Sequence, residues 1–309
     1  MAGRLQVVTA SALLALSAAG LAGAAEPGGP AKRTLANPFF VFNNGVKDDA
    51  HATPAQQVAL VKRIGFAGME KNGLDDFAET LAELDRQGLE LFTVYVNVNL
   101  DPGQPAYDPR LPDAIRSLKG RRTMLWINVT SREGTYAPSS RDGDAAAARV
   151  LGEVADLAKA SGLQVMVYPH VWFWLESVPH AIELVRKIDR PDVGLAFNLP
   201  HWLALTEPAD EAALRELLAR ARPHIFAVSV NGATNLEDKS DRGTIWRSLI
   251  QPLGEGTFDT CGLLGTLVDL GYAGPVGLQC YAVPEAKEEH LARSMAAWRA
   301  CRERIAAGR

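Results

Sequence analysis

Short apolar runs typical of β-strands alternate with amphipathic stretches typical of α-helices from residue 39 to residue 305. The expected strands are Phe39–Asn43, Gly68–Lys71, Leu89–Asn97, Thr123–Val129, Leu163–Pro169, Val193–Leu199, Ile225–Asn231 and Val276–Tyr281. The expected helices are Pro54–Ile64, Leu74–Gln87, Leu111–Ser117, Asp144–Ala160, Pro179–Ile188, Glu211–Ala221, Asp259–Leu270 and Ala286–Ile305. Gly or Pro stands at nearly every passage from helix to strand, as at Gly65 and Gly88. The alternation predicts parallel strands, because parallel neighbours need a crossover connection that is usually helical.

Eight such units predict an α/β fold, namely a (β/α)₈ TIM barrel in a single domain, and about 280 residues suit that fold. The alternative is a doubly wound open sheet. That fold usually carries a Gly-rich phosphate-binding turn after its first strand, and no such turn follows Phe39–Asn43. The sequence contains no internal repeat and no linker. We therefore expect residues 38–309 to form one barrel domain, preceded by a leader over residues 26–37.

Residues 1–25 have the order of a secretory signal peptide. Arg4 precedes the uncharged, Ala- and Leu-rich run Leu5–Leu21, and the small residues Ala22–Ala25 follow it. This order predicts cleavage near Ala24 or Ala25 and export to the periplasm or the medium. An uncleaved membrane anchor is the alternative, although no cationic flank follows the run. After cleavage we expect a soluble product without a membrane partner.

Composition excludes several classes of function. The chain has 32 Lys and Arg against 36 Asp and Glu, a formal net charge of −4, so nothing favours nucleic acid as a partner. Its cysteines, Cys261, Cys280 and Cys301, are too few for a disulfide framework and form no CxxC pair of the kind that binds zinc. We expect them to be small buried residues. If a bridge forms, we expect it to join Cys280 and Cys301.

Alternate residues of a barrel strand point inward, and functional groups gather at the carboxyl ends of the strands, here called the mouth. From the third strand onward, one face of each strand becomes polar toward that end. The inward residues are Thr93, Tyr95, Asn97 and Asn99; Trp126, Asn128 and Thr130; Met166, Tyr168, His170 and Trp172; Gly194, Ala196 and Asn198; Ala227, Ser229 and Asn231; Gly277, Gln279 and Tyr281. Buried amides are costly without partners, so this convergence predicts a site for a polar ligand.

Amides, hydroxyls and flanking aromatic rings suit a polyhydroxylated ligand, because amides bind hydroxyl groups and rings cover the apolar side of a sugar. The expected substrate-binding residues are Tyr95, Asn97, Trp126, Asn128, Trp172, Asn198, Asn231, Arg247 and Gln279. The cluster Trp172–Trp174 has an equal alternative as packing against the next helix. The segment Gly254–Gly256 resembles a tight loop that enters a helix. With Arg247 nearby it could contact a phosphate group, but a short glycine-flanked loop is weak evidence for that.

Four titratable side chains at the mouth are candidates for proton transfer. Tyr168 and His170 end the fifth strand, His201 follows the sixth, and Glu70 has the inward parity of Gly68 on the second. We rank His170 first, because an imidazole exchanges protons near neutral pH, with His201 and Glu70 as the second group. The alternatives are structural histidines and a salt bridge at the rim. The remaining histidines are expected to be solvated: His51, His180, His224 and His290.

Together these motifs resemble the xylose-isomerase-like TIM barrels, which include sugar phosphate isomerases and epimerases. The resemblance extends from Phe39 to about Trp298. Its carriers are Gly65–Glu70, Leu89–Leu100, Tyr168-Pro169-His170, Phe197–Trp202, Pro252–Asp259 and Gly271–Gln279. It implies a TIM barrel that acts on a sugar.

The sequence departs from this family where metal-dependent members carry acidic and His ligands on strands five to eight. Those places hold Tyr168, Asn198, Ser229 and Gln279, with His170 and His201 retained beside them. Without anionic ligands a divalent metal is disfavoured, and we expect no cofactor. If a metal binds, its expected ligands are His170, Asn198, His201 and Gln279.

The residues and the resemblance together predict an exported, carbohydrate-active enzyme. It would act on a sugar or keto sugar by proton transfer next to a carbonyl, in isomerisation or epimerisation, or in elimination or hydration. The alternative is a non-catalytic periplasmic carbohydrate-binding protein on a degenerate isomerase scaffold. In both cases the partner is a small carbohydrate, and export favours one without phosphate.

Overall fold

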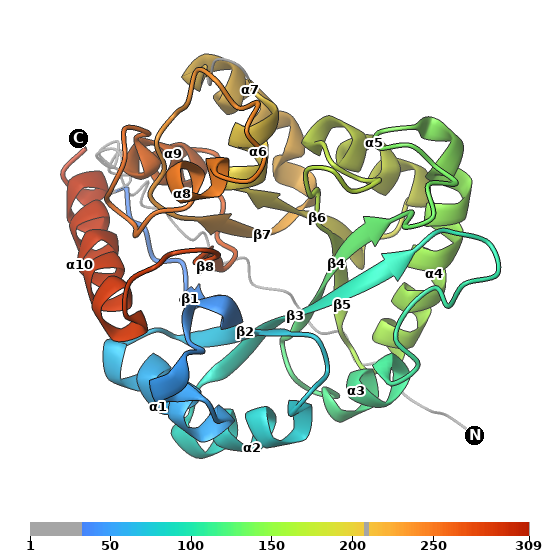
Figure 1. Ribbon diagram of the computed structural model, residues 1–309, viewed down its shortest axis with the longest axis horizontal. Helices are drawn as coiled ribbons and strands as arrows, with labels where there is room; N and C mark the ends of the chain where they lie inside the picture. The colour runs from blue at the N-terminus through green and yellow to red at the C-terminus, as the bar shows by residue number, and fades with distance from the viewer. Residues whose placement is uncertain (1–32, 207–209, 309) are drawn as a thin grey trace, which may run out of the picture. The chain divides into compact units, whose positions relative to one another are not determined.

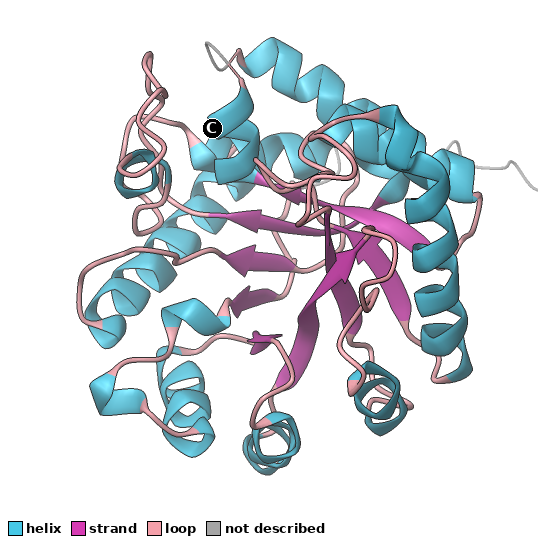
Figure 2. Ribbon diagram, turned by 45° about the vertical axis from the view of Figure 1, so that its right-hand side comes forward, coloured by secondary structure: helices cyan, strands magenta, loops and turns pink. Residues whose placement is uncertain are grey.

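The chain forms a closed barrel of parallel strands surrounded by helices (Figure 1, Figure 2). The computed structural model describes residues 33–206 and 210–308. Each strand pairs with its neighbours in the sequence, and the last pairs with the first, as in the register of Phe40 with Gly277. The predicted TIM barrel in a single domain is thus confirmed. The predicted signal peptide and most of the leader lie outside the described residues. Within these, no helix is long and apolar enough to cross a membrane.

The predicted elements are all present, with ends that differ by up to three residues. The strands are β1 (Phe39–Val41), β2 (Gly68–Asn72), β3 (Glu90–Asn99), β4 (Met124–Thr130), β5 (Gln164–Val167), β6 (Val193–Asn198), β7 (Ile225–Val230) and β8 (Val276–Leu278). The helices are α1 (Pro54–Ile64), α2 (Phe77–Gln87), α3 (Leu111–Ser117), α4 (Asp144–Ala160), α5 (Val178–Ile188), α6 (Leu199–Leu205), α7 (Glu211–Ala221), α8 (Ile245–Leu249), α9 (Thr260–Asp269) and α10 (Lys287–Ala306). The short helices α6 and α8, which follow β6 and β7, were not predicted.

Local signals explain where the helices begin and end. At the start of α1 the Thr53 side chain accepts a hydrogen bond from the Gln56 N–H, and the Gln56 side chain accepts from the Thr53 N–H. The helix ends at Gly65, whose φ of 97° is left-handed and favours a residue without Cβ. Such caps satisfy the terminal backbone groups and direct the chain into the next strand.

Two hydrophobic clusters stabilise the fold. One lies between the strands and the surrounding helices. The other fills the barrel interior and comprises Phe40, Phe42, Phe92, Met124, Trp126, Met166, Tyr168, Ala196 and Ala227. Gly277 makes room for it, because a Cβ there would lie 2.6 Å from the rings of Phe40 and Phe42. Aromatic side chains therefore occupy the interior up to the mouth.

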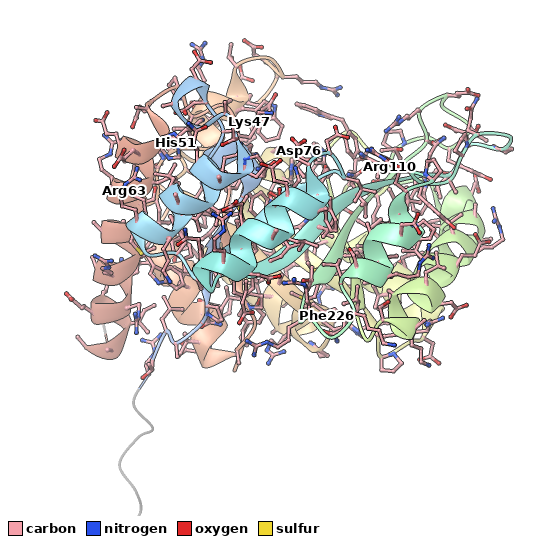
Figure 3. All side chains as sticks on the ribbon, turned by 90° about the horizontal axis from the view of Figure 1, so that it is seen from below. Lys47, His51, Arg63, Asp76, Arg110 and Phe226 are labelled. Carbon is pink, nitrogen blue, oxygen red and sulfur yellow. A yellow bond between two sulfur atoms is a disulfide. The ribbon has the colours of Figure 1, made fainter. Side chains whose placement is uncertain are left out.

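The mouth is formed by the loops that follow the strands. In Figure 3 the labelled residues Lys47, His51, Asp76 and Arg110 lie along that edge of the molecule, whereas Phe226, at the start of β7, lies at the opposite edge. The strands thus run in one direction toward a common rim. Residues at their carboxyl ends are consequently brought close together.

Two of the histidines that we expected to be solvated are buried. His180 and His290 are each 1% exposed. His180 Nε2 lies 2.7 Å from Asp144 Oδ1, and Lys187 donates to the other oxygen of that carboxylate. The expectation was wrong for both, because His180 has a partner from a distant part of the sequence in Asp144, on α4, and His290 lies on the buried side of α10. His51 and His224 are half-buried.

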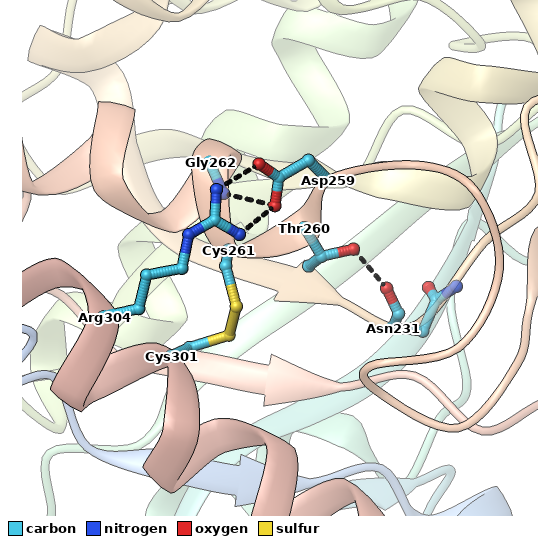
Figure 4. The surroundings of a disulfide bond; sticks show 7 residues. All are labelled: Asn231, Asp259, Thr260, Cys261, Gly262, Cys301 and Arg304. Carbon is cyan, nitrogen blue, oxygen red and sulfur yellow. Dashed lines mark hydrogen bonds and ion pairs between the residues drawn. A yellow bond between two sulfur atoms is a disulfide. The ribbon is translucent and has the colours of Figure 1, made fainter. Parts of the chain in front are cut away.

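A disulfide between Cys261 and Cys301 joins α9 to α10 (Figure 4). Beside it, Arg304 pairs with Asp259, the N-cap residue of α9, at 2.6 Å. The expected bridge between Cys280 and Cys301 is therefore wrong. Cys280 is a buried free thiol that packs against Gly45 in the turn after β1, and Cys261 takes the place beside Cys301.

Removing this disulfide is expected to destabilise the barrel. The bridge closes a loop of 40 residues, for which chain entropy gives about 4 kcal/mol. The double variant Cys261→Ser, Cys301→Ser should lower the thermal midpoint by about 5 to 8 °C in a calorimetric scan. As a control, a thiol reductant should lower the midpoint of the wild type but not that of the variant. Three reactive thiols in the denatured, unreduced wild type would contradict the bridge.

Candidate functional site

A cavity of about 320 Å³, here called the central cavity, opens at the mouth of the barrel. Its walls come from the carboxyl ends of every strand except β4 and from the loops that follow them. The lining residues are Phe42, Asn44, Glu70, Asn72, Tyr95, Tyr168, His170, Trp172, His201, Trp246, Ile250, Gln279 and Tyr281. Polar groups and aromatic rings therefore face the same space.

Seven of the predicted site residues line this cavity: Glu70, Tyr95, Tyr168, His170, Trp172, His201 and Gln279. They include all four candidates for proton transfer. The structure brings them together because the inward parity of each strand continues into the first residues of its loop. Tyr168 and His170 come two and four positions after Met166, which lies in the barrel interior.

Two predicted binding residues lie beneath the cavity instead. Trp126 is 1% exposed and packs edge-on against the rings of Phe42 and Tyr168. Asn128 is fully buried beside the Tyr95 hydroxyl. Both point inward as predicted, but β4 carries them too deep in the barrel to line the cavity. They support its floor.

Two further predicted binding residues form structural hydrogen bonds. Asn198 caps α6 by accepting from the His201 N–H at 3.2 Å, and its amide donates to the Ser229 hydroxyl at 2.5 Å. The Asn231 amide donates to the backbone carbonyls of Gly232 and Leu249. These amides hold loops at the mouth, and neither lines the central cavity. Asn198 lines a smaller cavity together with His201, and a role of the two amides in binding stays a prediction.

The remaining two predicted binding residues lie elsewhere. Asn97 is exposed and lines a neighbouring cavity, and Arg247 is exposed outside the central cavity. The loop Gly254–Gly256 does not line the central cavity either. A Cβ on Gly256 would lie 2.1 Å from the carbonyl oxygen of Ala233, so this loop packs closely against protein.

Sequence reasoning missed six lining residues. Asn72 has the parity of Glu70 on the same strand, so the rule applied to the later strands would have found it. Tyr281 has the inward parity of Gln279 but was not chosen. Phe42 has the inward parity of Phe40, so the same rule would have found it. Asn44 lies in a turn after β1, and Trp246 and Ile250 lie in or directly after the unpredicted helix α8, where no strand parity applies.

Glu70 is the acidic residue among those that line the cavity. It is 3% exposed, and its Oε2 accepts one hydrogen bond, from the Asn43 N–H at 3.0 Å. Burial raises its pKa to about 7, against the opposing effects of that hydrogen bond and of the Lys71 charge. The ion pairs of the described residues do not include it, which excludes the alternative of a rim salt bridge. The carboxyl thus exchanges protons near neutral pH.

The imidazoles of His170 and His201 lie against one another with ring centroids 3.9 Å apart. Burial lowers the pKa of His170 to about 4, and burial together with the neighbouring His170 lowers the pKa of His201 well below its ordinary value. Both rings are therefore neutral at pH 7. His170 Nδ1 lies 2.9 Å from the Val171 carbonyl, which can only accept, so Nδ1 donates and Nε2 is the acceptor.

Hydrogen bonds of the Gln279 amide connect the loops that follow β1 and β8. Gln279 Oε1 accepts from the Asn44 amide at 2.8 Å and from the Cys280 and Tyr281 N–H groups. The buried Asn44 Oδ1 and His201 Nδ1 have no hydrogen-bond partner within the described residues. Because buried polar atoms are normally paired, these two atoms indicate a polar ligand.

Trp172 and Trp246 form an aromatic wall, with ring centroids 5.4 Å apart. Arg242 lies over the Trp172 ring at 5.2 Å from its centroid. Trp172 adopts a φ of 70°, an uncommon conformation for a bulky residue, and its N–H donates to Glu176 Oε2 at 3.1 Å. The two rings thus add apolar surface to a cavity that polar side chains also line.

A family model for xylose isomerase-like TIM barrels matches residues 58–301. The chain belongs to this family. The sequence prediction of the family is thereby confirmed. A comparison with curated protein sequences finds no significant match.

Several solved structures are similar in fold to this chain. An apo 3-keto-D-glucoside 4-epimerase from E. coli has a TM-score of 0.66 at 17% identity, covering 86% of this chain and 100% of that one. An L-ribulose 3-epimerase has a TM-score of 0.68 at 15% identity, covering 87% and 96%. The IOLI protein with a bound zinc atom has a TM-score of 0.66 at 14% identity, covering 87% and 99%. At these identities the likeness shows the fold.

The donor set of this xylose-isomerase-like chain does not fit a divalent metal ion. Within the described residues no group of three or more His, Cys, Asp or Glu side chains can hold one. Of the four positions where family members carry metal ligands, Asn198 and Ser229 bond to each other, and Gln279 contacts the Tyr168 hydroxyl. Neutral groups that are already hydrogen-bonded attract a hard cation weakly. That no metal binds remains a prediction.

The burial of Glu70 predicts a pH-dependent gain in stability for Glu70→Gln. The folded state disfavours the ionised form of this carboxyl and so raises its pKa from 4.5 to about 7. The free energy of unfolding therefore falls as the pH rises from about 4.5 to about 7. Gln removes that loss. Urea unfolding should show the variant more stable than the wild type at pH 8 by up to about 3 kcal/mol, and nearly equal at pH 4.5.

Glu79→Gln is the matched control, since Glu79 is an exposed carboxylate on α2. Its effect should be small and the same at both pH values. A Glu70→Gln variant whose stability runs parallel to that of the wild type across this range would contradict the burial effect.

Proposed function

We propose that this protein is a sugar isomerase or epimerase that moves a proton beside the carbonyl group of its substrate. The observation that carries the proposal is the buried Glu70 carboxyl, with a pKa of about 7, in a cavity of neutral polar groups and aromatic rings. A general base with such a pKa is suited to remove a proton near neutral pH. Family membership and epimerases for 3-keto-D-glucoside and L-ribulose among the similar structures support a sugar as substrate.

Glu70 is the proposed proton acceptor. In the barrel order, β2 lies across from β5 and β6, so Glu70 faces the two imidazoles across the central cavity. The carboxylate takes the proton from the carbon next to the carbonyl, and the electron pair of that C–H bond moves to give an enediolate. In isomerisation, the protonated Glu70 then returns the proton to the neighbouring carbon. In epimerisation, the same carbon would take a proton on its opposite face, from a group on the other side of the cavity. This assignment places Glu70 before His170, because burial makes the imidazole a weaker base than the carboxylate.

His170 is the proposed group for the oxygen-bound proton. Isomerisation turns a hydroxyl into a carbonyl while the adjacent carbonyl becomes a hydroxyl, so one proton has to pass between two oxygens. A neutral imidazole can accept at one nitrogen and donate at the other. The Gln279 amide and the Tyr168 hydroxyl line the same cavity and would form hydrogen bonds with the developing oxyanion. The low polarity of the surroundings strengthens such hydrogen bonds.

The same groups support two other outcomes. Elimination or hydration across the sugar ring begins with the same proton removal and differs in which bond then breaks. A carbohydrate-binding protein without catalysis needs only the aromatic wall and the amides, and the unpartnered Asn44 Oδ1 suits it equally. The enzyme is favoured because binding alone gives no reason to bury a carboxyl that forms no ion pair within the described residues.

We also propose that the protein is exported. The predicted signal peptide motivates this proposal, and the disulfide between Cys261 and Cys301 supports it, because such bonds persist mainly in oxidising compartments. An exported enzyme would meet sugars without phosphate.

Hydrogen–deuterium exchange tests the proposed chemistry. In deuterated buffer, proton NMR should show that the protein exchanges the hydrogen next to the carbonyl in at least one member of a panel of keto sugars and 3-keto-glucosides. The rate should rise with pH through about 7, because Glu70 must be ionised to accept a proton. Glu70→Gln should slow the exchange by about 100- to 10,000-fold.

Two controls complete this test. Glu79→Gln should leave the rate unchanged, and EDTA should have no effect if no metal takes part. Tight binding of a panel sugar without exchange would overturn the enzyme in favour of the binding protein. Exchange that persists in Glu70→Gln and vanishes in His170→Asn would return the role of the base to His170.

A further inference from the structure

A second cavity of about 470 Å³, here called the outer cavity, lies beside the central one. Tyr95 lines both cavities, and the adjacent residues Asn72 and Gly73 line the central and the outer one respectively. The two cavities therefore share Tyr95 as a lining residue. Nothing in the proposed proton transfer uses the outer cavity.

The strand β3 forms a continuous wall from one cavity to the other. It is ten residues long and stays paired with β4 up to Asn99 and Thr130, beyond the ends of the other strands (Figure 1). Tyr95, Asn97 and Asn99 alternate along it, so they share one face over about 13 Å. Asn97 and Asn99 both line the outer cavity. A ligand that extends past Tyr95 would meet these amides next.

The opposite wall of the outer cavity is held by its own contacts. The loop after β3 returns to the strand through a hydrogen bond from the Asn99 N–H to the Ala106 carbonyl at 2.8 Å. Gln104 donates to Glu133 at 2.7 Å, and Arg110 pairs with Asp108 and Asp75. The lining thus includes the charged residues Asp108, Arg132 and Glu133, of which Asp108 pairs with Arg110. Beside them the cavity offers three amide side chains and the half-buried ring of Tyr107. That is again the chemistry of a sugar site.

We propose that the outer cavity is a second sugar subsite, so that the substrate is a glycoside or disaccharide with two ring units. One ring enters the central cavity for proton transfer, and the other lies along β3 against Asn97, Asn99 and Tyr107. This inference rests on the proposed function for the identity of the ligand. It adds that a free monosaccharide occupies only half of the site.

Calorimetric binding of matched ketone pairs tests the subsite without requiring turnover. The probes are D-fructose against the keto disaccharides maltulose, isomaltulose and lactulose, and methyl 3-keto-glucoside against a 3-keto disaccharide. At least one disaccharide should bind the wild type tenfold or more tighter than its monosaccharide partner. In Asn97→Trp, whose bulky ring fills the outer cavity, this ratio should fall at least tenfold.

Gln164→Ala is the matched control, because Gln164 is an exposed strand amide at the opposite end of the barrel, and it should keep the ratio. Equal affinities within every pair, no disaccharide binding, or a ratio unchanged in Asn97→Trp would overturn the subsite. A preserved binding ratio without hydrogen exchange would overturn the proposed enzyme and leave the subsite standing. Hydrogen exchange together with equal affinities for the two members of every pair would overturn the subsite and leave the proposed enzyme standing.

Discussion

The carboxyl group of Glu70 lies at the barrel mouth with one backbone N–H as its hydrogen-bond donor and with aromatic rings around it. Moving a charge into such surroundings is costly, and the protein lowers that cost by holding the proton up to about pH 7. The same burial acts in the opposite direction on His170 and His201, because it disfavours their charged forms. One physical cause therefore yields an acid–base group that titrates near neutrality and, across the cavity, imidazoles that are uncharged.

The rest of the fold maintains this environment. The closed barrel brings β2 opposite β5 and β6, and its interior is filled by large side chains such as Phe40, Trp126 and Tyr168, which keep water from reaching the site from below. Above the mouth, Trp172 and Trp246 supply an apolar wall. The stability that the buried carboxyl costs is offset elsewhere, in the hydrophobic layer under the helices and in the disulfide that joins α9 to α10. The candidate site thus lies at the mouth, whereas the contacts that stabilise the fold lie mainly in other parts of the barrel.

The periodicity of the sequence carried the prediction of the barrel and of its inward-facing residues. Parity placed Glu70, Tyr168 and Gln279 correctly, because the strand period fixes direction. It does not fix depth: Trp126 lies below the cavity and Asn97 beyond it, though both point the predicted way. Nor does parity show local hydrogen bonds, so it gives no sign that the Asn198 side chain caps α6.

Other features depend on contacts between distant segments. The wall residue Trp246 lies on the short helix α8 after β7, which the sequence pattern does not predict, and the partner of Cys301 depends on how α9 packs against α10. The proposed proton transfer depends on a buried Glu70 carboxyl that titrates near neutral pH. Carbon NMR of protein labelled at the glutamate carboxyl carbons, with the Glu70 signal assigned by its loss in Glu70→Gln, measures this pKa directly. The account predicts a midpoint near pH 7, and a midpoint near the ordinary value of 4.5 would contradict it.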